Sequence, residues 1–252
     1  MKQGAIFFLI TFAVIPLRAQ HLSGDDIIQK VNEILSPESS HGMSQMTITT
    51  TSGDKRTFVM ESWSKNKGEK NLVRYLEPLR VKDQAVLMLN NADDIWMYFP
   101  RTQRVRKLAT HAKKQKMQGS DFSYEDMGSG DAFIREFAAR RLKDDTIEGH
   151  DCYCVELTRK ADGDMSYSRL LLWIVKENYV PILIEYYDEN DPNRLVKRLK
   201  QSDIVEINGI PTARKAVMTN EDDNSQTSME ITEIEYNIDL SDDLFTERGM
   251  RQ

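Results

Sequence analysis

The side chains best suited to catalysis or metal binding are few and match no known catalytic motif. The four histidines are His21, His41, His111 and His150, and no two lie four residues apart, so the spacing of a zinc-binding helix is missing. The sequence also lacks a nucleophile elbow, a P-loop and a dinucleotide-binding glycine loop. We therefore predict that the protein is not an enzyme and holds no metal or cofactor.

Two acidic runs could suggest a calcium site. They are residues 188–191 (DEND) and 221–224 (EDDN). Neither belongs to a twelve-residue loop with a terminal glutamate, the pattern of a calcium-binding loop. Solvent-exposed hairpin turns are the simpler interpretation.

Cys152 and Cys154 are separated by one residue, so in a strand both thiols would point to the same face. A direct disulfide between them would be strained and easily reduced. The pair could serve redox chemistry or metal binding. Alternatively, the two thiols are small apolar core groups, and this interpretation is the simpler one.

The clearest electrostatic feature is residues 101–116 (RTQRVRKLATHAKKQK), which hold seven basic residues and no acidic one. The whole chain, by contrast, has a net charge of −6. This basic segment could dock an anionic partner or lipid headgroups, or it could be a solvated basic loop. The candidate docking residues are Arg101, Arg104, Arg106 and Lys107. We predict no nucleic-acid partner, because the chain is acidic overall.

The N-terminus has the layout of a secretory signal peptide. Lys2 precedes an uncharged apolar run at residues 4–17, and a small residue, Ala19, follows. The run is too short for a membrane helix, which needs about 20 apolar residues. We predict residues 1–19 to be a signal peptide cut after Ala19, leaving a soluble chain in an oxidising compartment. No cysteine lies near the cut, so the mature N-terminus cannot be acylated.

The remaining sequence predicts one helix and many strands. Apolar residues at helical spacing, from Ile27 to Leu35, predict an amphipathic helix over residues 24–36. Strand-like runs separated by turn residues then recur. About eleven are expected, at residues 43–51, 56–64, 70–76, 85–89, 95–99, 152–158, 169–175, 181–188, 195–207, 212–219 and 227–236.

Consecutive hairpins of this kind predict one antiparallel sheet, and so many strands must curl or split into layers. The expected fold is mainly β, an incomplete and strongly curved antiparallel β-barrel. Its N-terminal amphipathic helix would serve as a lid or plug. Residues 131–142 (DAFIREFAARRL) could form a second short helix.

Bulky apolar side chains recur on the early strands and on the predicted helix. They could form an ordinary core, or they could line a cavity for an apolar ligand. The candidate cavity residues are Ile27, Val31, Ile34, Phe58, Met60, Trp63, Leu87, Leu89, Trp96 and Tyr98.

The segment IWMYFPRTQRVRKL followed by MQGSDFSYEDM resembles the outer-membrane lipoprotein-sorting protein family, whose members are similar to the periplasmic carrier LolA. The resemblance implies an incomplete β-barrel around a helical lid, with an apolar cavity between them. It implies a non-catalytic carrier of lipoproteins or lipids. Its expected partners are acylated cargo, an inner-membrane transporter and an outer-membrane acceptor.

The family motif within this segment comprises Gly119, Ser120, Asp121 and Phe122. It could contact ligand. Alternatively, it is structural, with the glycine in a turn and the aspartate capping backbone N–H groups.

We therefore expect residues 20–252 to form a single LolA-like domain that shuttles acyl chains across the periplasm towards the outer membrane. The alternative is a non-transporting sensor or scaffold of the same fold, which docks an envelope transporter through residues 101–116. A carrier should copurify with lipid, whereas a scaffold should not.

Overall fold

The computed structural model describes residues 22–128 and 130–252. The expected signal peptide, its cut after Ala19 and the new N-terminus at Gln20 lie outside the described residues. None of the helices in the described ranges has the length and hydropathy of a membrane-spanning helix.

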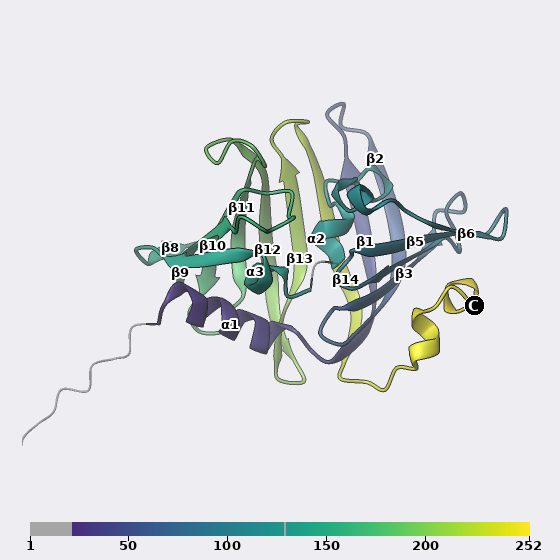
Figure 1. Ribbon diagram of the computed structural model, residues 1–252, viewed down its shortest axis with the longest axis horizontal. Helices are drawn as coiled ribbons and strands as arrows, with labels where there is room; N and C mark the ends of the chain where they lie inside the picture. Colours follow the sequence, from purple (N-terminus) through teal and green to yellow (C-terminus); the bar gives the residue numbers. More distant parts are fainter. Residues whose placement is uncertain (1–21, 129) are drawn as a thin grey trace, which may run out of the picture.

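Fourteen strands of the described chain form one antiparallel sheet (Figure 1). Their bounds are β1 (Ser39–Thr49), β2 (Lys55–Lys65), β3 (Lys70–Glu77), β4 (Ala85–Leu89), β5 (Asp94–Phe99), β6 (Arg104–Lys107), β7 (Phe137–Arg141), β8 (Asp145–Ile147), β9 (His150–Arg159), β10 (Arg169–Val175), β11 (Pro181–Tyr187), β12 (Leu195–Ile207), β13 (Ile210–Asn220) and β14 (Ser225–Tyr236).

The strand order places the first and last strands side by side in the centre of the sheet. It runs β6-β5-β4-β3-β2-β1-β14-β13-β12-β11-β10-β9-β7, with β8 paired to β9. Strands β6 and β7 are the two ends of this path and do not pair with each other. The sheet is therefore strongly curved but open, which confirms the incomplete antiparallel barrel expected from the sequence.

The expected helix is confirmed as α1 (Gly24–Leu35). Ser23 caps its first turn, because its hydroxyl accepts from the Asp26 N–H while the Asp26 carboxylate accepts from the Ser23 N–H. The helix ends at Leu35, because its C-cap Ser36 directly precedes Pro37, and proline disfavours helical backbone in the preceding residue. Ile27, Ile28 and Val31 form its buried face.

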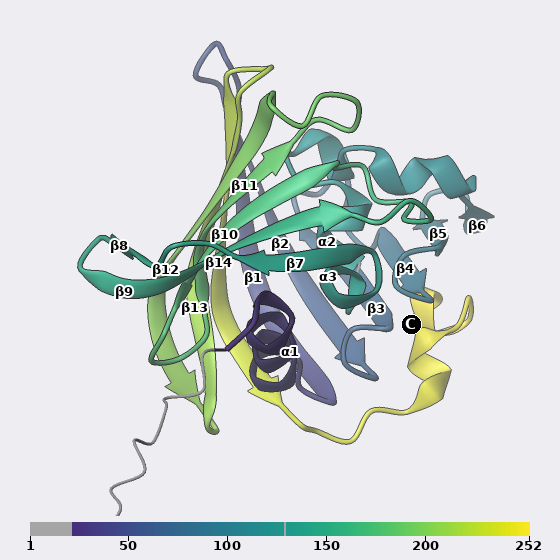
Figure 2. The ribbon, with the colours of Figure 1, turned by 60° about the vertical axis from the view of Figure 1, so that its left-hand side comes forward.

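Helix α1 lies along the open side of the curved sheet (Figure 2). Its N-terminal end is fixed to the edge strand β7. The Asp25 carboxylate accepts from the Ala139 N–H at 3.3 Å, and the carbonyl of Leu22 accepts from the Arg141 guanidinium at 3.0 Å. A Cβ on Gly24 would lie 2.8 Å from the Ala139 carbonyl oxygen, so only glycine allows this close approach.

The expected second helix over residues 131–142 is wrong for most of its length. The helical part is α3 (Ala132–Arg135), and Phe137–Arg141 forms β7 instead. The composition FAARR favours a helix. Pairing of β7 with β9 and packing of Phe137 in the core beneath α1 outweigh that local preference.

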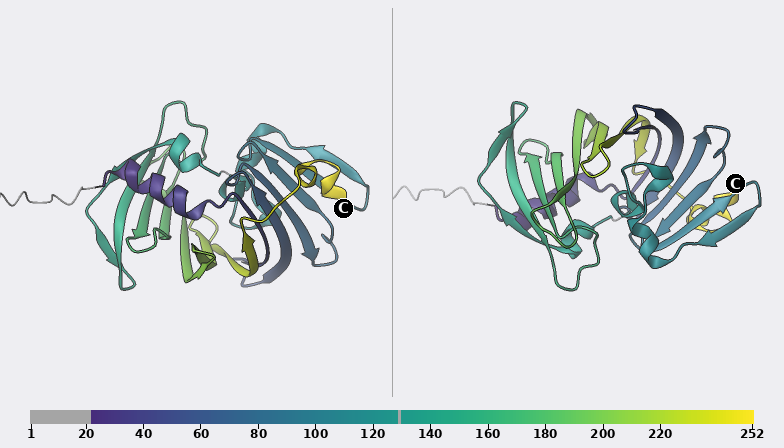
Figure 3. Two further views of the ribbon diagram at one scale, coloured as in Figure 1. Left: turned by 90° about the horizontal axis from the view of Figure 1, so that it is seen from below. Right: turned by 90° about the horizontal axis from the view of Figure 1, so that it is seen from above.

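Residues 108–136 connect the two edges of the sheet. Within them lie η1 (Thr110–Lys114), η2 (Met117–Gly119), α2 (Tyr124–Gly128) and α3. We call residues 108–136 the crossover segment. At the other end of the chain, η3 (Asp242–Phe245) and η4 (Gly249–Arg251) form a C-terminal segment beside β3 and β4, apart from α1 (Figure 3).

Candidate functional site

An apolar cavity of about 190 Å³ lies where β1, β2, β3 and β14 meet the crossover segment. Most of its lining is apolar, with four methionines. The lining residues are Gly42, Met43, Ser44, Met60, Ser62, Val73, Met127, Met229, Ile231, Glu233 and Ile234.

A local irregularity of the sheet shapes this cavity. The pairing of β1 with β14 shifts register between Met43 and Ser44. A Cβ on Gly42 would lie only 2.6 Å from the carbonyl oxygen of Glu233, so glycine is required there. Bulges of this kind bend a strand and redirect its side chains.

The cavity lies at the boundary between two interior hydrophobic clusters. One cluster contains the buried face of α1 and strands β9 to β11, and the other contains β1 to β5 with Met117 and Tyr124 of the crossover segment. Met127 and Met229 pack against both clusters and line the cavity. Methionine side chains are flexible and polarisable, so this boundary can adapt to apolar ligands of different shape.

The ten candidate cavity residues do not lie around one cavity but in different hydrophobic clusters and pockets. Ile27 and Val31 pack in the α1 cluster, and Phe58 and Met60 pack in the β1–β5 cluster. Ile34 borders a separate surface pocket with Asn178 and Pro211. Only Met60 of the ten belongs to the lining of the apolar cavity.

The other five candidates belong to a cluster on the opposite face of β2 to β5. Side chains alternate along a strand, so Val86 and Met88 face the interior while Leu87 and Leu89 face outward. Phe245 and Met250 of the C-terminal segment cover this outer face. The five residues are Trp63, Leu87, Leu89, Trp96 and Tyr98.

Ion pairs hold the C-terminal segment in place. The Asp242 carboxylate lies 3.0 Å from the Lys70 ammonium and 3.1 Å from that of Lys65, and these two lysines lower its pKa. The Arg74 guanidinium donates to the Gly249 carbonyl at 3.2 Å. The aromatic residues beneath are thus part of a covered outer core.

The family motif fixes the crossover segment to the sheet. Asp121 is 1% exposed, and its carboxylate accepts from the hydroxyls of Ser225 at 2.6 Å and Thr227 at 2.7 Å. Ser120 closes a tight turn, because its hydroxyl accepts from the Phe122 N–H at 3.2 Å. Gly119 has a φ of +74°, which favours glycine. These contacts describe a structural role for the motif.

Two acidic residues of α2, Glu125 and Asp126, anchor this helix to the other half of the sheet. The Asp126 carboxylate accepts from Lys197 of β12 at 2.9 Å and from the Tyr167 hydroxyl at 2.9 Å. Glu125 accepts from the N–H and hydroxyl of Ser166. Burial raises the pKa of Glu125 to about 7, outweighing the opposing effect of these hydrogen bonds. The sequence did not predict either role, although the acidic pair lies only two residues beyond the motif.

Three of the candidate docking residues lie on β6, on both of its faces, and Arg101 lies in the turn before it. Arg104 and Arg106 pair in register with Phe99 and Met97, whereas Lys107 pairs with Trp96 of the outer face. The Lys107 ammonium is 2.5 Å from the Asp94 carboxylate and 5.0 Å from the Trp96 ring centroid. Arg101, Arg104 and Arg106 are exposed. Lys107 therefore differs from Arg104 and Arg106 in both the face it occupies and its ion pairing.

Cys152 and Cys154 are free thiols, both buried. Burial is the main cause that raises the pKa of Cys152, and it raises the pKa of Cys154 to about 11. Cys152 packs with Val175, Val180 and Ile182. This placement agrees with the interpretation of the pair as apolar core groups.

A family model described as "Uncharacterized protein" matches residues 67–252, which is 186 of the 252 residues. The chain belongs to this family. Among curated proteins, none has a sequence that matches this chain.

Solved structures similar to this member of the family confirm the resemblance found in the sequence. An outer membrane lipoprotein-sorting protein domain from Vibrio parahaemolyticus has a TM-score of 0.82 at 24% identity, covering 91% of this chain and 98% of its own. A DUF1329 family protein from Desulfovibrio piger also has a TM-score of 0.82, at 26% identity, covering 90% and 97%. A LolA superfamily protein from Nitrosomonas europaea has 0.75 at 22% identity, covering 90% and 98%. The fold is therefore LolA-like.

Proposed function

We propose that residues 20–252 form a periplasmic carrier domain that binds acyl chains of lipoproteins or lipids in the apolar cavity and moves them towards the outer membrane. The observation that carries this proposal is the cavity itself, which lies at the seam of two interior clusters. Two similar structures, described as a lipoprotein-sorting protein domain and a LolA superfamily protein, support it.

The energetics of cargo explain why such a carrier needs an apolar interior. Burying a sixteen-carbon chain contributes about 0.8 kcal/mol per methylene, on the order of 10 kcal/mol in total. A carrier has to offer comparable apolar contact, or the chain remains in the membrane. The methionine-rich lining provides an apolar surface that adapts to the ligand.

The cavity is small for this task as it stands. Pockets for drug-sized ligands measure about 300–1,000 Å³, compared with about 190 Å³ here. We therefore assign the structure to the closed state, and cargo enters when the clusters on the two sides of Met127 and Met229 separate. Helix α1, whose apolar face packs in one of these clusters, is the lid.

Filling the cavity tests the proposal. Ser62 and Ser64 are half-buried residues on the same face of β2, but only Ser62 lines the cavity. We expect Ser62→Leu to weaken binding of a fluorescent fatty acid by roughly tenfold, about 1.4 kcal/mol. Ser64→Leu is the matched control and should bind as the unchanged protein does.

Lipids extracted from the natively purified protein separate the carrier from the scaffold alternative. Mass spectrometry should detect acyl lipid with the unchanged protein and less of it with Ser62→Leu. Unchanged probe affinity in both variants, together with no copurified lipid, would favour the scaffold that docks an envelope transporter through residues 101–116.

A further inference from the structure

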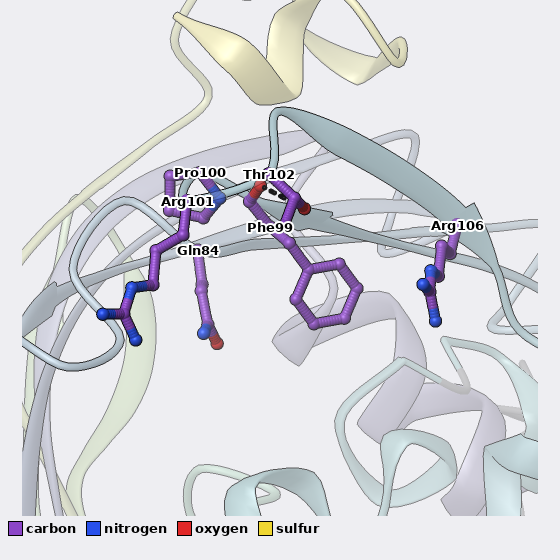
Figure 4. A pocket seen from close by; sticks show the side chains of 6 residues that line it. All are labelled: Gln84, Phe99, Pro100, Arg101, Thr102 and Arg106. Atoms are coloured by element: carbon purple, nitrogen blue, oxygen red, sulfur yellow. Dashed lines mark hydrogen bonds between the residues drawn. The ribbon is translucent and has the colours of Figure 1, made fainter.

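A second pocket, separate from the apolar cavity, lies at the hairpin between β5 and β6 and measures about 240 Å³. It shares no lining residue with the cavity. Its six lining residues are Gln84, Phe99, Pro100, Arg101, Thr102 and Arg106, whose side chains Figure 4 shows.

The pocket combines an apolar surface with two cations. Phe99 at the end of β5 is half-buried, and the Arg106 guanidinium is 5.9 Å from its ring centroid. Gln84, Phe99, Arg101 and Arg106 extend from the backbone to the same side (Figure 4). Such a site offers forked N–H donors for an anion and a ring surface for the attached carbon chain.

Two further arginines, outside the lining, connect to Gln84 of the pocket through short chains of contacts. The Gln118 amide donates to the Gln84 side-chain oxygen at 3.2 Å. Next to Gln118, the Arg56 guanidinium lies 3.4 Å from where a Cβ on Gly119 would be. Arg80 lies over the Phe58 ring at 5.5 Å, and Phe58 contacts Tyr75, whose N–H donates to the Gln84 carbonyl.

These arginines lack carboxylate partners within the described residues. No Asp or Glu oxygen of that part lies within 4.0 Å of Arg56, Arg80, Arg101, Arg104 or Arg106. The other half of the sheet is different, because most of its arginines are ion-paired. Examples are Arg140 and Arg169 with Glu156, Arg194 with Asp188, and Arg198 with Glu185. The two arginines that line the pocket therefore carry positive charge that no carboxylate of the described residues neutralises.

We propose that this pocket binds the phosphate group of an anionic ligand. Arg101 and Arg106 hold the phosphate oxygens, Gln84 donates or accepts a further hydrogen bond, and Phe99 contacts the adjoining carbon chain. Arginine is suited to this role because its planar guanidinium bonds two phosphate oxygens at once. The inference does not depend on acyl transport, since the pocket and the cavity have separate linings.

The test is a titration of the full mature chain with monomeric six-carbon phosphatidylglycerol, followed by calorimetry. The double variant Arg101→Gln/Arg106→Gln should bind at least roughly tenfold more weakly. Arg248→Gln/Lys143→Gln removes the same charge from exposed positions elsewhere and is the matched control, which should bind as the unchanged protein does. Circular dichroism checks that all variants fold.

Inorganic phosphate and hexyl glucoside, which has no phosphate, distinguish the sources of the group. Tighter binding of phosphatidylglycerol than of inorganic phosphate identifies a lipid headgroup, and equal binding identifies free phosphate. Both results support the site, provided that the Arg101/Arg106 variant binds these phosphate ligands more weakly than the unchanged protein. Equal binding by both double variants would overturn it, as would binding of hexyl glucoside with the same affinity. The proposal would also be overturned if the Arg101/Arg106 variant kept its affinity for phosphate and lost only the binding of a protein partner.

The result is independent of the acyl-chain experiment. If Ser62→Leu leaves fatty-acid binding unchanged while the arginine variant loses phosphate binding, the carrier proposal fails and the phosphate site stands. The reverse pattern retains the carrier and removes the phosphate site.

Discussion

Asp121 and Thr227 bond to each other twice. The Asp121 N–H donates to the Thr227 hydroxyl oxygen at 2.9 Å, and that hydroxyl donates to the Asp121 carboxylate at 2.7 Å. Both residues are buried, at 1% and 0% exposure. The pair joins the crossover segment to the central strand β14. If the segment moved away from the sheet, the Asp121 carboxylate and the Thr227 hydroxyl would each lose a hydrogen-bond partner or become exposed to water.

Removing this pair should destabilise the protein. We expect Thr227→Val to lower the free energy of unfolding by about 1–3 kcal/mol, because the Asp121 carboxylate loses a donor while buried. Urea unfolding measures the change. Thr232→Val on the exposed part of β14 is the control and should have an effect under about 0.5 kcal/mol. An equal effect of both substitutions would contradict the stabilising role of the Asp121–Thr227 pair.

Weakening the lid should affect ligand binding as well as stability. Val31→Ala with Ile34→Ala should lower the free energy of unfolding by about 1–3 kcal/mol. Cargo competes with the closed state, so a fluorescent acyl probe should bind more tightly to this variant. Val86→Ala, a buried valine of the other cluster, should lose stability with no gain in probe affinity. Loss of stability in both, with tighter binding in neither, would count against a lid.

Glu125 should make stability depend on pH. Its pKa of about 7 is raised from the ordinary 4.5, so the folded state binds more protons than the unfolded state between these values. Its contribution to stability is therefore complete below about pH 4.5 and is lost as the pH rises through about 7.

The variant Glu125→Gln removes this titration. In urea unfolding at about pH 8, its free energy of unfolding should exceed that of the unchanged protein by on the order of 1–3 kcal/mol. This difference should shrink at about pH 5. A stability difference that stays the same at both pH values would show that the carboxyl group is not the cause.

The two cysteines should resist alkylation in the folded protein. Burial raises the pKa of Cys152 and brings that of Cys154 to about 11, so little thiolate exists near neutral pH. We expect iodoacetamide at about pH 8 to react at least roughly tenfold more slowly than with a free peptide thiol. Mass spectrometry counts the adducts, and the denatured chain should take up two. Fast labelling of the native protein would indicate the redox interpretation instead.

Most of the fold follows from the sequence, because the strands obey simple rules. Arg169–Val175 and Leu195–Ile207 were predicted to the residue, since each is a strand-forming run bounded by turn residues. Strands β6, β7 and β8 were not predicted. They are short or rich in charge and alanine, and they exist because β5 and β9 pair with them.

The site was harder to predict than the fold. Apolar side chains such as Trp96 and Ile95 are neighbours in the sequence but lie on opposite faces of β5. Which face is interior depends on what covers each face, and the C-terminal segment that covers Trp96 comes from the distant end of the chain. Met127 and Met229 line the cavity through contacts between segments distant in the sequence, and no local pattern encodes such contacts.

The central pairing of β1 with β14 also governs when this protein can fold. Ser40 pairs with Tyr236, so the middle of the sheet forms only after almost the whole chain has been synthesised. Contacts this distant in sequence slow folding to the range of about milliseconds to seconds. A chain still passing through a ribosome or a translocation channel lacks β14, and both β1 and β13 then present open edges in the middle of the sheet, where a strand of another molecule can pair. Such a nascent chain therefore depends on being kept apart from its neighbours until its last strand is free.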